Sequence, residues 1–167
     1  MTIIGIDPGK NGGIAIENDG VMRMPKDVLE VGRMLKDYDR PLVFLEKLSI
    51  RPDDMSFGKA ARVQTMLGDY ERLKTGLEVY QIPYVMVHPM KWQKGACVRL
   101  QGVHEEKAAR KKRYKEAAER LYPNIRVTLW NADALLILRF GMLAVQRDKS
   151  WVISNLPSQF KGIFWQS

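Results

Sequence analysis

Three acidic residues stand where apolar segments of this chain begin or end. Asp7 and Glu46 each follow a short apolar segment of strand length, and Asp133 comes directly before a longer apolar stretch. A buried carboxylate is costly unless a cation or a hydrogen-bond donor replaces its lost hydration. Mg²⁺ prefers oxygen ligands, and two such ions can promote hydrolysis of a phosphodiester. Converging acids would therefore predict a hydrolytic metal site, in which Mn²⁺ can replace Mg²⁺.

Each of these acids also has an interpretation without chemistry. Aspartate before Pro8 and Gly9 is a frequent turn residue, Glu46 can pair with a lysine at a strand end, and Asp133 can cap a helix. One cysteine and two separated histidines exclude a cysteine-based zinc site, so any metal must be held mainly by oxygen. Both interpretations stay open, and the metal site requires that the three acids meet in space.

The charge balance favours a polyanionic partner. Lys and Arg outnumber Asp and Glu by 27 to 19, giving a formal charge of +8. Helical spacing places Lys107, Lys111 and Lys115 on one stripe, which suits a row of phosphates and makes nucleic acid the leading candidate. The alternative is a basic, solvated surface that only aids solubility.

Other residues are candidates for contacts with DNA. Phe57, just after a polar stretch, is either a wedge between bases or the first core residue of a helix. Lys91 and Lys94 flank a tryptophan that we expect to pack in the core, and Arg99 lies in the basic loop that follows. We expect these three basic residues to contact DNA as well.

Apolar periodicity and turn residues predict an α/β fold in which a mixed five-stranded central sheet is flanked by helices. We expect one domain over residues 1–167, with helix 132–145 entered through Asn131 or Asp133 as a cap, and a tail from residue 149 that packs on the domain or on a dimer partner. The expected strands are 2–6, 14–16, 21–24, 42–45 and 84–87; the expected helices are 28–35, 56–80, 105–121 and 132–145, with a short helix and basic loop at 90–102.

Several segments together resemble the RuvC family of Holliday junction resolvases. The opening Ile3–Gly9 with Gly12–Ala15 is similar to the first motif of that family, and Phe44–Glu46 is similar to its second acidic strand. Further similar segments are Pro89–Lys94, Ala118–Pro123 and Ala132–Leu136. They follow in the family's order over nearly the whole chain, so the resemblance implies an RNase H-like fold.

The resemblance also implies a function. It points to a two-metal endonuclease that cuts branched DNA such as a four-way junction as a homodimer, with Asp7, Glu46 and Asp133 as metal ligands and no small-molecule cofactor. Lys111 or Lys112 would stabilise the transition state beside the metals. The family has a fourth acid a few residues before the last aspartate, whereas this chain has Asn131 nearby, whose carbonyl oxygen is at most a weak ligand.

That departure keeps other functions open. The chain is alternatively a non-catalytic binder of branched DNA, or a nuclease for forks, flaps or RNA:DNA hybrids. An actin-like phosphotransferase would share only the glycine loop at Asp7, and this chain is too short for its two domains. Without an apolar run of membrane-spanning length or a signal segment, we expect a soluble protein inside the cell. Small size and divergence from the pattern of bacterial chromosomal members of the family suggest a phage or mobile-element type.

Overall fold

The structure is a computed structural model that describes residues 1–50, 59–96, 98–100 and 105–162. Its centre is a five-stranded sheet in the order β3-β2-β1-β4-β5. β1 to β3 form an antiparallel meander, whereas β4 and β5 run parallel to β1, so the predicted mixed sheet is confirmed. The strands span Ile3–Ile6 (β1), Gly13–Ile16 (β2), Gly20–Arg23 (β3), Leu42–Glu46 (β4) and Tyr84–Val87 (β5).

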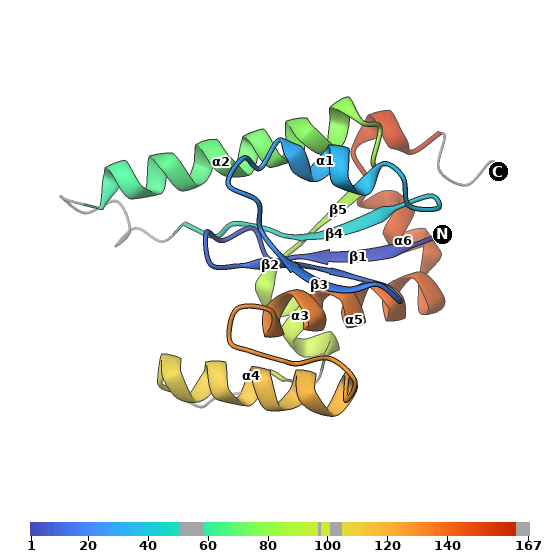
Figure 1. Ribbon diagram of the computed structural model, residues 1–167. Coiled ribbons are helices and arrows are strands. Elements are labelled where there is room, and N and C mark those ends of the chain that lie inside the picture. The colour runs from blue at the N-terminus through green and yellow to red at the C-terminus, as the bar shows by residue number, and fades with distance from the viewer. Residues whose placement is uncertain (51–58, 97, 101–104, 163–167) are drawn as a thin grey trace.

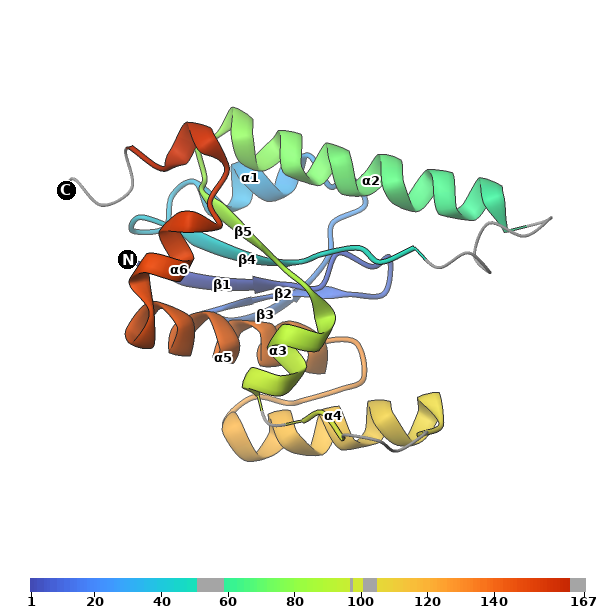
Figure 2. The ribbon, with the colours of Figure 1, turned by 180° about the vertical axis from the view of Figure 1, so that it is seen from behind.

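Helices cover both faces of this sheet. Figure 1 shows α1 and α2 on one face and α5 on the other, with α4 beyond α5. α5 packs on β1, β2 and β4, and α4 packs on α5. Figure 2 shows α3 between the end of β5 and α4. The helices span Glu30–Leu35 (α1), Ala60–Val79 (α2), Pro89–Gly95 (α3), Lys107–Leu121 (α4), Ala132–Arg147 (α5) and Lys149–Ser154 (α6), and a 3-10 turn spans Ser158–Phe160.

The contact between α5 and β1 is unusually close. A Cβ placed on Gly5 would lie 2.3 Å from the backbone N of Leu138 and 2.5 Å from the carbonyl O of Ala134. Glycine at position 5 therefore lets the helix backbone rest directly on the strand. This contact brings the first turn of α5 to the edge of the sheet where β1 ends.

The long helix α2 differs from the prediction in its first half. Apolar residues recur along this helix at intervals of three and four, which predicts one buried face. Val63, Tyr70 and Leu73 on that face are buried, but Leu67 is 37% exposed and Ala60 is also exposed. Figure 1 shows that the beginning of α2 extends past the sheet. The predicted buried face is interrupted at Leu67, which lies between the buried residues Val63 and Tyr70.

The tail after α5 packs back on its own domain over the residues that the structure describes. Trp151 meets Phe140 edge to face at 5.8 Å between ring centroids, and Phe160 meets Tyr84 at 6.2 Å. This is the first of the two predicted alternatives, so the described tail gives the expected dimer no support. Among the described helices, none combines the length and apolar character that crossing a membrane requires.

Candidate active site

Asp7 lies in a tight loop directly after β1. Its Oδ1 accepts a hydrogen bond from Gly9 N at 3.2 Å, and its own backbone N donates to Gly13 O at 3.0 Å. The backbone of Gly12 approaches so closely that a Cβ there would lie 2.2 Å from Asp7 O. The turn interpretation of Asp7 is therefore correct, and the same turn fixes the carboxylate at the edge of the sheet.

Glu46 is brought beside Asp7 by the register of two parallel strands. Ile6 of β1 pairs with Leu45 of β4, so the next residues along the two strands are Asp7 and Glu46. Burial first, and then the charges of Asp7 and Asp133, raise the pKa of Glu46 to about 8. The two acids thus share one edge of the sheet, as the sequence predicted.

Asp133 reaches the same edge from the first turn of α5. It is only 7% exposed, and its Oδ2 pairs with Nζ of Lys111 on α4. Its Oδ1 is buried and finds no hydrogen-bond partner among the described residues. The pKa of Asp7 rises to about 6, mainly through burial and then through the charge of Asp133, while Lys111 lowers it. The three acids therefore lie near enough to influence one another's pKa, and Lys111 pairs with one of them, Asp133.

The donor set suits a hard divalent cation in its chemistry. Three carboxylates are ligands of the kind that Mg²⁺ prefers. The negative charge of the site is poorly compensated, because Asp133 Oδ1 has no partner in the described structure and the pKa values of Asp7 and Glu46 are raised. In the part of the chain that the structure describes, however, no three His, Cys, Asp or Glu side chains are arranged so that they could hold an ion. Closer approach of the acids is needed, and the Lys111 contact with Asp133 competes with it.

Asn131 has a different role from the weak ligand that we expected. The residue is buried, its Oδ1 accepts a hydrogen bond from Thr128 N at 2.7 Å, and its Nδ2 donates to Arg126 O at 3.1 Å. Asn131 stands at the N-cap position of α5, as predicted, but its side chain turns back to hold the loop before the helix and makes no capping hydrogen bond. An amide oxygen already engaged in this way is a poor candidate ligand.

The predicted lysine stripe on α4 lines a groove of about 950 Å³. Residues 126–129 form the opposite wall, with Leu129 58% exposed. Lys111 lies where the groove meets the carboxylates, whereas Lys112 is exposed on the groove wall, which makes Lys111 the lysine of the site. The charged lining consists of Glu106, Lys107, Lys111, Lys112, Lys115 and Arg126.

The remaining DNA-binding candidates lie apart from the groove lining. Nζ of Lys91 sits 3.6 Å from the centroid of the Trp151 ring, so this lysine helps to hold the tail on the domain. Burial also lowers the pKa of Lys91. Lys94 and Arg99 are exposed. Phe57 lies outside the described residues.

Two aromatic residues beside Glu46 were not predicted to belong to the site. Trp92 is buried, and its indole N–H lies near enough to Glu46 to lower the pKa of that carboxyl, although it makes no normal hydrogen bond with any described residue. The pKa of the buried Tyr70 hydroxyl is raised, mainly by burial and to a smaller extent by the charge of Glu46. Only one feature of the sequence indicated that an aromatic residue lies near Glu46: Trp92 follows shortly after β5, the strand that runs parallel to β4.

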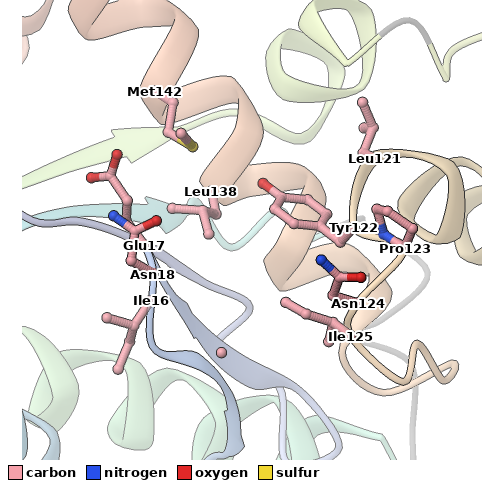
Figure 3. Close-up of a pocket in the computed structure, with 11 residues that line it drawn as sticks. Ile16, Glu17, Asn18, Leu121, Tyr122, Pro123, Asn124, Ile125, Leu138 and Met142 are labelled. Atoms are coloured by element: carbon pink, nitrogen blue, oxygen red, sulfur yellow. The ribbon is translucent and has the colours of Figure 1, made fainter.

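Another pocket, of about 420 Å³, lies between the β2–β3 hairpin, the end of α4 and α5 (Figure 3). Its one carboxylate is Glu17, whose Oε2 accepts a hydrogen bond from Ile3 N at 3.0 Å. Leu138, Met142 and Ile125 make much of its wall apolar. None of the predicted site residues that the structure describes lines this pocket, so we do not place the chemistry there.

Comparison with solved structures identifies the fold. RuvC of T. thermophilus in complex with a Holliday junction substrate matches with a TM-score of 0.54 and 16% identity, covering 89% of this chain and 97% of that one. A Thermus thermophilus RuvC structure matches with a TM-score of 0.52 and 19% identity, covering 87% and 96%. The chain has the RuvC fold.

The likeness to RuvC extends across the sheet and its helices, because it covers nearly all of both solved chains. The RNase H-like fold expected from the sequence is thereby confirmed. No family model and no curated protein matches the sequence. The chemistry assigned to this RuvC fold therefore rests on the side chains described above.

Proposed function

We propose that this chain is a divalent-metal-dependent endonuclease that resolves Holliday junctions or other branched DNA. The observation that carries the proposal is the meeting of Asp7, Glu46 and Asp133 at one edge of the sheet, with a buried Asp133 oxygen that lacks a partner in the described structure. The adjoining basic groove supports a polyanionic substrate. One protein of the same fold is a RuvC bound to a Holliday junction.

In this proposal the three carboxylates bind Mg²⁺, with two ions expected and Mn²⁺ able to replace them. Bound Mg²⁺ supplies polarisation of the phosphodiester and a water nucleophile at neutral pH. Asp7 is held by its turn, Glu46 by the β4 register and Asp133 by the first turn of α5. These elements fix the backbone of each ligand, so the closer approach of the carboxylates that an ion requires is left to their side chains.

Lys111 and the groove act on the substrate. The Lys111 ammonium lies beside the carboxylates and stabilises negative charge that develops on the phosphate oxygens. Lys107, Lys112 and Lys115 hold the neighbouring phosphates along the groove. These contacts position the backbone and leave recognition of the junction to DNA shape.

We further propose that the chain acts on DNA inside the cell, as a single domain, and as a homodimer that cuts two strands symmetrically. The single domain is supported by one hydrophobic cluster that spans the sheet and the helices on both faces. The homodimer rests on the family resemblance. Light scattering at micromolar concentration with and without a junction tests it, and a monomer mass in both conditions contradicts it.

A cleavage assay tests the main proposal. Labelled four-way junction, fork, flap, RNA:DNA hybrid and plain duplex are incubated with Mg²⁺ or Mn²⁺, and the Asp7→Asn protein serves as the blank. We expect the wild type to nick the junction and Asp7→Asn to bind it without cleavage. Wild-type rates from Asp7→Asn would show that the site is misassigned.

A second candidate function is a non-catalytic binder of branched DNA. It is favoured by Asn131, whose amide is engaged with the loop where the family has an acid nearby. This candidate predicts junction binding that weakens steeply with salt, because phosphate contacts release counterions, and no nicks with either metal. The same assay separates the two functions.

A further inference from the structure

Lys111 is shared by the two parts of the proposed site, the carboxylates and the basic groove. Nζ of Lys111 pairs with Asp133 Oδ2, and the same side chain lines the groove between α4 and residues 126–129. The Lys111 side chain is 32% exposed and that of Asp133 is 10% exposed. The lysine side chain is therefore partly open where it lines the groove, while the carboxylate that it neutralises is nearly closed to solvent.

Two kinds of ligand would each separate this ion pair, one by binding Asp133 and the other by binding Lys111. A divalent cation at Asp133 repels the Lys111 ammonium, because both carry positive charge. A phosphodiester in the groove attracts that ammonium. Four further cationic side chains favour phosphates there: Lys107, Lys112, Lys115 and Arg126. A lysine side chain is a flexible four-carbon stem with three donors, so it can leave one partner for the other without movement of the helix.

The geometry points to a coupling through Lys111: a phosphodiester bound in the groove draws Lys111 from Asp133 and thereby raises the affinity of the carboxylates for a divalent cation. The inference rests on the proposed metal site. It adds that DNA and cation bind cooperatively, and linkage requires each to raise the affinity for the other by the same factor. The free protein then holds a cation weakly and acquires it together with its substrate.

Calorimetric binding of Ca²⁺ tests this coupling, because Ca²⁺ takes oxygen ligands as Mg²⁺ does. The titration is made with and without a four-way junction, and a gel confirms that the DNA is intact afterwards. Lys111→Met is compared with Lys115→Met, which removes one charge from the same helix a turn later and breaks only an exposed pair with Glu119. Asp133→Asn and DNA alone are the blanks, and thermal melting checks that each variant is folded.

We expect a saturating amount of the junction to tighten Ca²⁺ binding about tenfold in the wild type, within the usual range for coupled sites. Lys115→Met should bind the junction more weakly but keep this gain once it is saturated with DNA. Lys111→Met should bind Ca²⁺ more tightly without DNA and lose most of the gain that DNA brings. An equal gain in Lys111→Met and Lys115→Met overturns the coupling, because the charge of DNA alone then explains it. Unchanged Ca²⁺ binding by Asp133→Asn overturns the metal site itself, which is a separate failure.

Discussion

Gly5 on β1 and Leu138 on α5 touch through their backbones. The missing side chain at position 5 leaves the α5 backbone so close that a Cβ would lie 2.3 Å from Leu138 N and 2.8 Å from its Cα. Asp133 lies at the beginning of the same helix and Asp7 directly after the same strand. The distance between these two acids therefore depends on this glycine contact.

Replacement of Gly5 by alanine should force α5 away from β1. Backbone atoms cannot move aside as a flexible side chain does, so we expect Gly5→Ala to lower the free energy of unfolding by about 3 kcal/mol, at the upper end of overpacking costs. Urea unfolding measures this. Gly68→Ala is the matched control, because no described atom lies within 4 Å of the added methyl and alanine favours a helix by about 0.5–1 kcal/mol. Equal stabilities of the two variants would contradict the close contact.

The positions of Asp7 and Glu46 were predictable because they follow from strand order. A short apolar run that ends in an acid predicts the edge of the sheet, and the crossover from β1 to β4 predicts parallel neighbours. The register Ile6 to Leu45 then sets the two acids side by side. Local patterns were sufficient at these places because Asp7 comes directly after β1 and Glu46 is the last residue of β4.

Other features depend on tertiary contacts that no local pattern carries. Lys111 and Lys112 differ by one step on a helix, about 100° of rotation, and only the packing of α4 on α5 decides which faces Asp133. The hydrogen bonds of Asn131 depend on the path of an irregular loop. The exposure of Leu67, between the buried residues Val63 and Tyr70, is likewise a detail that periodicity alone cannot show.

The raised pKa of Glu46 predicts how stability changes with pH in the absence of metal. Burial first, and then Asp7 and Asp133, raises this pKa to about 8, whereas an unfolded chain has a glutamate pKa of about 4.3. Between these values the folded chain binds more protons than the unfolded chain, so the free energy of unfolding falls as the pH rises. Glu46→Gln removes this titration and should be more stable than the wild type near pH 8 in EDTA.

Urea unfolding in EDTA over the range from about pH 4 to about pH 8 measures the effect. Glu116→Gln, on the exposed face of α4, is the control and should follow the wild-type profile. A profile for Glu46→Gln that runs parallel to that of the wild type throughout would show that Glu46 ionises without this cost. Added Mg²⁺ should stabilise the wild type most where the carboxylates are ionised, and less in Glu46→Gln.

Aspartate at position 131 should not restore a fourth ligand. Asn131 donates through Nδ2 to Arg126 O, and a carboxylate would lose this donor and face the carbonyl oxygen instead. We expect Asn131→Asp to cost about 1–3 kcal/mol of stability, the usual penalty for an unsatisfied buried group, without faster cleavage. Leu129→Asp, at a position that is 58% exposed, should change stability by only about 0.5 kcal/mol. Faster cleavage by stable Asn131→Asp protein would assign a ligand position to residue 131.

Variants of Lys112 and Lys91 should distinguish a lysine that contacts DNA from one that packs within the domain. Lys112 is exposed in the α4 groove, so Lys112→Ala should weaken junction binding and reduce the slope of log affinity against log salt by about 1. Nζ of Lys91 instead lies over the Trp151 ring, so Lys91→Ala should leave that slope unchanged and cost about 0.5–1 kcal/mol of stability through the lost cation–π contact. Fluorescence anisotropy at several salt concentrations and urea unfolding measure the two effects. If Lys91→Ala reduces the salt slope as much as Lys112→Ala does, Lys91 contacts phosphate and the basic surface extends from the groove to α3.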